Sequence, residues 1–184
     1  IITLDTADTT IAADDTVGSY VLTGAGANTI TLVAAAQGVT TAVNASAQGI
    51  NTGLLATYTG TIVGNATDTS TTLTIGATNT DISGATLNIG AATGVDVLAQ
   101  AGNAITMSSA QHDSLIAVSA TAAITGAGII TLDTVDTTIA ADATVASYVL
   151  TGAGANTITL AAAAQGVTTA VNASAQGINT GLLA

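Results

Sequence analysis

The stretch LTGAGANTITL, residues 22–32, places a short β-branched run directly after a Gly- and Asn-containing segment, and it recurs unchanged at 150–160. Related stretches are ITGAGIITL at 124–132 and QAGNAITM at 100–107. Isoleucine and threonine favour strands, whereas glycine and asparagine mark the turns between strands. The pattern therefore predicts a chain of many short strands that are joined by tight turns.

The repetition extends far beyond this stretch. Residues 1–56 align with 129–184 at a constant offset of 128, and 52 of the 56 positions are identical. The differing pairs are Ala7 and Val135, Asp15 and Ala143, Gly18 and Ala146, and Val33 and Ala161. A fixed period is typical of a repeat array. We interpret 1–128 as one full repeat of a tandem array and 129–184 as the first part of the next, and we expect the array to continue.

A finer period lies inside the long one. The pattern Ile-Thr-(Leu or Met) begins at Ile2, Ile30, Ile105, Ile130 and Ile158. This spacing predicts coils of about 26 residues, and thus an all-β fold in which the chain winds into a parallel β-solenoid with inward Ile, Leu, Val and Ala. The alternative is one β-sandwich module per repeat. That fold favours aromatic cores and turn prolines, and the chain has no Trp, Phe or Pro.

The expected strands can be placed along the chain. They are IITL at 1–4, SYVLTG at 19–24, NTITLV at 28–33, TTLTIG at 71–76, AITMSS at 104–109 and SLIAVSA at 114–120. The segment LVAAAQG at 32–38 also suits a short helix by propensity, since it is rich in alanine. Gly38 and Gly49 argue against a long helix there.

The charge balance narrows the range of partners. The chain has no Lys or Arg and carries a formal net charge of −11. Nucleic-acid binding depends on cationic side chains, and anionic membrane surfaces repel an acidic chain. Polar residues interrupt every apolar run before it reaches the roughly 20 residues of a membrane-spanning helix. We therefore expect no nucleic-acid partner and no membrane insertion, with metal cations or cationic partners as the natural counter-charges.

Aspartates supply the candidate metal ligands. They cluster in LDTADTTIAADD and in its second copy, where the residues are Asp5, Asp8, Asp14, Asp133, Asp136 and Asp142. Calcium takes six to eight oxygen ligands, which Asp and turn carbonyls supply well. Asp15 becomes Ala143 in the second copy, and the spacing matches neither an EF-hand nor a calcium-binding β-roll. The pattern predicts either Ca²⁺ sites or solvated turn residues that keep the shaft soluble.

Catalysis has one set of candidate residues. His112 is the only histidine, lies beside Asp113 and has Ser108, Ser109 and Ser114 nearby. Neighbours on a strand point to opposite faces, so this proximity implies no catalytic triad. We expect His112 to lie in a surface turn, and the three tyrosines to be partly buried fillers. The sequence predicts no enzyme, since a polysaccharide-cleaving solenoid would use Lys, Arg and clustered carboxylates in its cleft.

The segment ITMSSAQHDSLIAVSATAAITGAG at 105–128, in its Thr- and Ala-rich context without Lys or Arg, resembles the repeat regions of giant bacterial cell-surface proteins. These are long adhesins, surface-layer-like proteins and extracellular filament proteins. The resemblance implies an extracellular structural role and carries over no catalytic residue. We expect the shaft of a long fibre, filament or sheath, with further copies of itself as partners. The alternative is an adhesin whose repeats bind glycans, surfaces or ice directly.

Overall fold

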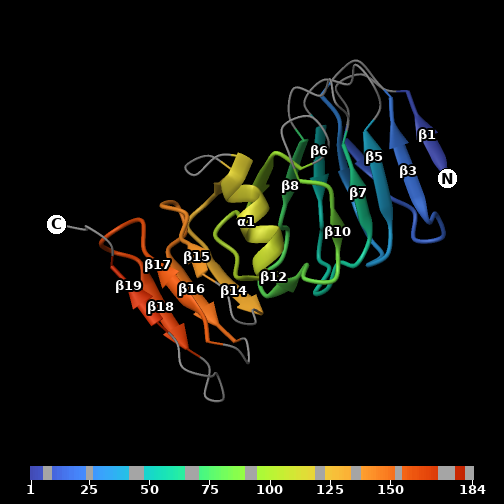
Figure 1. The fold of residues 1–184 in the computed structure, drawn as a ribbon. Coiled ribbons are helices and arrows are strands. Elements are labelled where there is room, and N and C mark those ends of the chain that lie inside the picture. Colours follow the sequence, from blue (N-terminus) through green and yellow to red (C-terminus); the bar gives the residue numbers. More distant parts are fainter. Residues whose placement is uncertain are drawn as a thin grey trace.

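A computed structural model gives the fold of this chain, in which every strand pairing is parallel (Figure 1). It describes residues 1–5, 10–23, 27–41, 48–64, 71–89, 95–118, 123–133, 138–151, 155–169 and 177–180. Within these ranges the chain forms short strands and one helix, α1 (Ser109–Val118). The strands stack as successive coils of a β-solenoid of about seven turns, and β1 and β19 lie at opposite ends. The predicted solenoid is therefore confirmed, and the alternative of β-sandwich modules is wrong.

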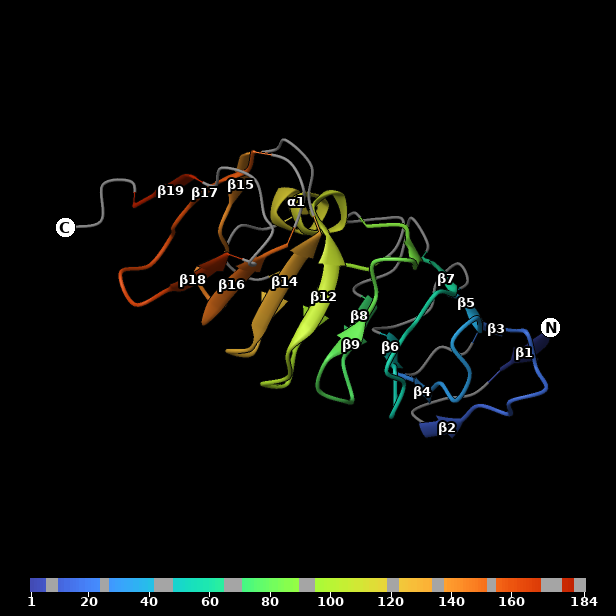
Figure 2. The same ribbon diagram turned by 90° about the horizontal axis from the view of Figure 1, so that it is seen from below.

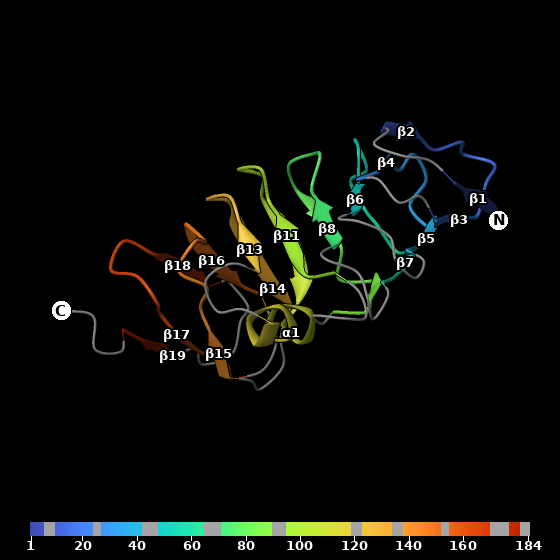
Figure 3. The same cartoon turned by 90° about the horizontal axis from the view of Figure 1, so that it is seen from above.

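The strands form four sheets, each named here by its first strand in the chain. The β1 sheet contains β1 (Ile2–Leu4), β3 (Ser19–Leu22), β5 (Gly38–Thr41), β7 (Thr61–Val63) and β10 (Thr86–Leu87). The β2 sheet, seen from above in Figure 3, contains β2 (Thr10–Ala12), β4 (Thr29–Thr31), β6 (Gln48–Asn51), β8 (Thr71–Thr74), β11 (Val97–Ala99) and β13 (Ile124–Thr125).

Two further sheets continue the shaft. The β9 sheet, prominent in the view from below in Figure 2, contains β9 (Thr80–Asp81), β12 (Ile105–Ser108), β14 (Ile129–Asp133), β16 (Ser147–Leu150) and β18 (Gly166–Thr169). The β15 sheet contains β15 (Thr138–Ala140), β17 (Thr157–Thr159) and β19 (Gly177–Asn179). Helix α1 lies between β10 and β15, so it separates the β1 sheet from the β15 sheet along one side of the shaft.

The core follows from strand alternation. Successive side chains on a strand point to opposite faces, and in parallel register the same inward position repeats from coil to coil. In the β2 sheet this register stacks one aliphatic column, formed by Ile11, Ile30, Ile50, Leu73, Leu98 and Ile124. All but Ile11 are fully buried. A continuous aliphatic column thus replaces the aromatic core that this composition cannot build.

The coils are shorter than the Ile-Thr spacing predicted, at about 20 residues each. They also differ in length along the shaft. Tyr20 pairs with Val39 in a short coil, whereas Leu98 pairs with the more distant Ile124 in a long one. The short coils contribute a strand to two sheets. The long coil that contains β8, β9 and β10 contributes a strand to a third sheet, and the long coil between Leu98 and Ile124 contains helix α1 after β12. The added strand and the helix account for the extra length.

The Ile-Thr-(Leu or Met) pattern therefore does not mark equivalent coil positions throughout. Ile2 lies in the β1 sheet and Ile30 in the β2 sheet, so their separation spans more than one coil. Ile105 and Ile130 do stack directly as Cα partners. The pattern recurs because the long repeat copies it, and only the pair of Ile105 and Ile130 reflects a single coil.

The two copies of the long repeat adopt the same local register. Ile2 pairs with Tyr20 in the first copy, and Ile130 pairs with Tyr148 in the second. Three of the four differing positions are described, and the residues there are exposed in both copies. Gly18 has no atom within 4 Å of an added Cβ, which explains why Ala146 is accepted in the second copy. The differences therefore leave the core unchanged.

Candidate functional site

The structure describes only some of the predicted metal ligands. Asp5 is exposed directly after β1, Asp14 is exposed in the turn before β3, and Asp142 in the equivalent turn is fully buried. Asp8, Asp136 and the side chain of Asp133 lie outside the described residues. Within the described part of the chain, no three side chains of metal-binding type come together. The Ca²⁺ sites stay a prediction.

The two described turn aspartates, Asp14 and Asp142, accept hydrogen bonds from residues of their own turns. Oδ1 of Asp14 accepts hydrogen bonds from the Thr16 hydroxyl at 2.6 Å and from the Thr16 N–H at 2.9 Å. Both hydrogen bonds lower the pKa of Asp14 below its ordinary value, and the bond from the Thr16 hydroxyl has the larger effect. Oδ1 of Asp142 accepts the matching pair from Thr144 at 2.6 and 2.7 Å. This is the Asx-turn geometry expected of turn-forming aspartates.

Asp142 belongs to a buried polar cluster, which we call the histidine cluster: His112, Tyr148, Asp142 and Thr144. The Tyr148 hydroxyl oxygen accepts the Asp142 N–H at 2.7 Å and lies 3.0 Å from Nε2 of His112. The Thr144 hydroxyl lies 2.6 Å from the Ile124 carbonyl oxygen. The cluster joins α1, β16 and the start of β13. Its members come from both sides of the boundary at residue 128 between the two copies.

Burial and geometry define what the cluster can do. His112, Asp142 and Tyr148 are each fully buried, and burial raises the pKa of Tyr148 well above its ordinary value. The rings of His112 and Tyr148 meet edge to face at a centroid distance of 5.5 Å. Oδ2 of Asp142 finds no hydrogen-bond partner among the described residues. The His112 ring is 0% exposed, so a substrate cannot reach it. The contacts of the cluster instead join separate parts of the shaft.

Two of the serines near His112, Ser108 and Ser114, form hydrogen bonds with groups other than the imidazole ring. The Ser108 hydroxyl accepts the Gln111 N–H at 3.2 Å, while Oε1 of Gln111 accepts the Ser108 N–H at 2.9 Å. The Ser114 hydroxyl donates to the Ala110 carbonyl at 2.7 Å. Ser108 and Gln111 thus form a capping box, the reciprocal pair that begins a helix.

The placement of His112 in a surface turn was therefore wrong, and so was the strand predicted at 114–120 over its described residues, 114–118. The capping box begins α1 at Ser109, and the helical path turns Gln111, His112 and Leu115 into the core. The spacing Ser-x-x-Gln at 108–111 was the available signal for this helix. The tyrosines are also more buried than predicted, at 3% exposed for Tyr20 and 0% for Tyr58 and Tyr148.

Glutamines fasten successive coils, a role that residue type and spacing did not reveal. Nε2 of Gln37 donates to the carbonyls of Asp14 and Val17, one coil earlier, at 2.7 and 3.0 Å. Its Oε1 accepts the N–H groups of Val33 and Ala34 at 2.9 and 3.0 Å. One side chain therefore satisfies four backbone groups at a corner of the shaft.

The same bridge recurs twice. Gln165 donates to the carbonyls of Asp142 and Val145, in keeping with its position in the second copy. Gln111, which is outside the copied region, donates to the carbonyls of Ile82 and Ala85, both at 2.9 Å. A separate bond adds to the first corner, where the Tyr58 hydroxyl donates to the Gln37 carbonyl at 2.9 Å.

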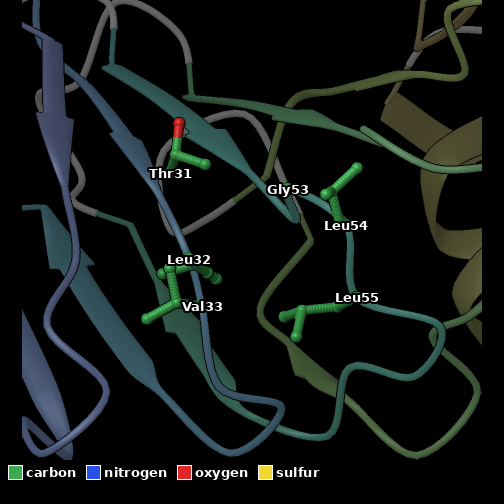
Figure 4. Close-up of a pocket in the computed structure, with 6 residues that line it drawn as sticks. All are labelled: Thr31, Leu32, Val33, Gly53, Leu54 and Leu55. Atoms are coloured by element: carbon green, nitrogen blue, oxygen red, sulfur yellow. The ribbon is translucent and has the colours of Figure 1, made fainter.

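An apolar groove opens on the surface between neighbouring corners (Figure 4). Its volume is about 410 Å³, and it is lined by Thr31, Leu32, Val33, Gly53, Leu54 and Leu55. Leu54 is 92% exposed and Val33 is 46% exposed. The groove is a surface feature of the shaft and lies apart from the histidine cluster.

Comparisons with protein-family models, curated proteins and solved structures found no match to this chain. Among the described residues, no helix combines the length and the hydropathy that crossing a bilayer requires. The structure therefore establishes a β-solenoid built from long repeats, and the function is inferred from its construction.

Proposed function

We propose that this chain is part of the shaft of a long extracellular fibre, filament or sheath. The observation that carries the proposal is the equal register of the two copies: β14 pairs with β16 as β1 pairs with β3, in two sheets of one solenoid. A repeat that adds to the end of its predecessor extends a shaft without a new interface. The number of repeats would then set its length.

The physical properties suit a spacer. Neighbouring coils are held together by parallel backbone ladders and by aliphatic columns, and at three corners also by glutamine bridges. The free energy of unfolding of such a solenoid is approximately the sum of the intrinsic stability of each repeat and the energies of the interfaces between neighbours. Each added repeat therefore stabilises the one beside it. The absence of Lys and Arg removes every trypsin cleavage site, which is an advantage outside the cell. The partners would be further copies of the chain, end to end or bundled, with Ca²⁺ between acidic shafts.

Electron microscopy of tandem arrays tests the proposal. Arrays of two, four and eight copies of residues 1–128 should appear as unbranched rods whose length rises linearly with copy number. A fibre power spectrum should contain a meridional reflection near the strand spacing of about 4.8 Å. Flexible beads without that reflection would exclude a stiff shaft.

The second candidate is an adhesin that binds a surface directly, and the apolar groove favours it. An exposed leucine such as Leu54 beside such a groove is a suitable contact for an apolar surface. Binding of labelled arrays to cells, glycans and ice would be compared for the native chain and Leu54→Asp. Binding that Leu54→Asp abolishes, with rods of unchanged length, would make adhesion the better description.

A further inference from the structure

The two copies expose the same surface to different degrees. Ile2 is 40% exposed, whereas its equivalent Ile130 is fully buried. Asp14 is exposed and its equivalent Asp142 is fully buried. At the other end the difference reverses, since Ile50 is fully buried and its equivalent Ile178 is 52% exposed. Position along the shaft, and not sequence, therefore decides which of these residues are covered.

The cover over the second copy is seen directly. Strand β12 pairs with β14, with Ile105 opposite Ile130 and Met107 opposite Leu132. Helix α1 packs on β15 and brings His112 to the Tyr148 hydroxyl. The segment that ends at residue 128 thus caps the start of the copy that follows it.

We propose that the face formed by β1, β2 and Tyr20 is a docking surface for a second copy of β12, α1 and β13, carried by a repeat that precedes it in a tandem chain. The inference rests on the proposed shaft and names the junction that builds it. The central contact is a hydrogen bond between the histidine of the added copy, equivalent to His112, and the Tyr20 hydroxyl.

The residues needed for this junction are already in place. Tyr20 accepts the Asp14 N–H at 2.6 Å, as Tyr148 accepts that of Asp142. The Thr16 hydroxyl donates to Asp14 at 2.6 Å, as the Thr144 hydroxyl does to Asp142, and the Thr144 hydroxyl oxygen also lies 2.6 Å from the Ile124 carbonyl oxygen. The first copy thus holds the receiving half of the histidine cluster in its bound geometry.

Register gives the strand pairing of the junction. By the same constant offset that relates the two copies, the added copy of Ile105 would lie opposite Ile2, and the added copy of Met107 opposite Leu4. Strand β1 forms the edge of its sheet, with β3 as its neighbour. An edge strand with apolar side chains readily pairs with another strand. The edge position of β1 and its aliphatic residues Ile2 and Leu4 therefore both favour a copy of β12 as the pairing strand.

The test is a chain in which residues 57–128 are placed ahead of Ile1, with its two histidine rings labelled for NMR. Both histidines should give the same ring shifts, which differ from those of an unfolded chain. Tyr20→Phe should move only the signals of the added histidine, and Tyr148→Phe only those of His112. Amide exchange in β1 should slow at least about tenfold relative to the parent chain, because closing the ladder protects an edge.

Two outcomes would overturn the inference. In one, the added histidine has the shifts of an unfolded chain and ignores Tyr20→Phe. In the other, β1 of the parent chain becomes protected as concentration rises, which would assign the face to a second molecule. Electron microscopy of the long arrays tests the proposed shaft separately. If the junction forms but the arrays are flexible, the result contradicts the proposed shaft and leaves the junction standing.

Discussion

Nε2 of His112 lies 3.0 Å from the Tyr148 hydroxyl oxygen, and this contact joins α1 to β16 across 36 residues of sequence. The Tyr148 hydroxyl also accepts the N–H of Asp142. One arrangement satisfies all these groups. Tyr148 donates its proton to Nε2, and the proton on Nδ1 faces Oδ1 of Asp113 at 3.4 Å. Tyr148 is thus the centre of the histidine cluster.

Tyr148→Phe should destabilise the chain. It removes the partner of two buried groups, the Asp142 N–H and the His112 ring nitrogen, while it keeps the aromatic packing. An unsatisfied buried polar group costs about 1–3 kcal/mol. We expect a loss in that range, measured as a lower midpoint of guanidinium unfolding by far-UV circular dichroism.

Tyr20→Phe is the matched control, because Tyr20 occupies the equivalent position and bonds the amide of the exposed Asp14. Water can replace the lost hydroxyl there, so the expected loss stays below about 1 kcal/mol. Equal losses for the two variants would show that His112 contributes nothing to the junction.

The histidine cluster shows how far sequence reasoning reaches. The solenoid was predicted from the spacing of the Ile-Thr-(Leu or Met) pattern within the long repeat and from the lack of Trp, Phe and Pro, which need no knowledge of distant contacts. The burial of His112 depended on a helix that strand propensity concealed, since the apolar residues of SLIAVSA suit either structure. The capping box at Ser108 and Gln111 was readable, whereas the meeting of His112 with Tyr148 depends on coil length. Coil length in turn depends on where a third strand or the helix is added.

Gln111→Ala should destabilise the middle of the shaft by about 1–3 kcal/mol. The substitution leaves the carbonyls of Ile82 and Ala85 without their side-chain donor and removes Oε1, the acceptor of the Ser108 N–H in the capping box of α1. The unfolding midpoint and the helical signal in circular dichroism measure the two effects. Gln165→Ala is the comparison, because Gln165 makes the same bridge at a half-buried corner. A larger effect for Gln165→Ala would contradict the dependence on burial.

The glutamine bridges could not be predicted from the sequence, for a different reason. A buried glutamine is readable only when its backbone partners are known, and the carbonyls that it bonds lie one coil away. Backbone carbonyl groups are the same in every residue type, so the sequence does not show which of them a glutamine side chain contacts. Gln37 and Gln165 were visible as copies of one another, but Gln111 lies in a segment with no second copy.

Stability should fall as the solution becomes alkaline. Burial raises the pKa of both Tyr58 and Tyr148 above the ordinary value of 10. A raised folded-state pKa means that the neutral form is favoured by folding. The contribution is therefore complete below about pH 10 and is lost as pH rises above it. The chain has no Lys, Arg or Cys, so tyrosines are the only side chains that titrate in this range.

The measurement is the unfolding midpoint between pH 8 and 12, with tyrosinate absorbance followed in parallel. The absorbance of Tyr58 and Tyr148 should appear together with unfolding. The variant that carries both Tyr58→Phe and Tyr148→Phe should lose most of the pH dependence. An unchanged slope in this variant would assign the alkaline loss to charge repulsion among the aspartates.

Gly60→Ala should be strongly destabilising, although a glycine in a coil corner looks replaceable. A Cβ at Gly60 would lie 2.1 Å from the Gln37 carbonyl oxygen and 2.7 Å from the Tyr58 hydroxyl oxygen. These two atoms are hydrogen-bonded to each other at 2.9 Å, so the methyl group separates a buried pair and pushes the Gln37 corner outward. Overpacking of this kind costs about 1–3 kcal/mol, and the lost hydrogen bond adds to it.

Gly18→Ala is the control, because the site is open and Ala146 occupies the equivalent position. Its stability should match or exceed that of the parent by up to about 1 kcal/mol. If both variants unfolded at the parent's midpoint, close approach between coils would not be what requires Gly60.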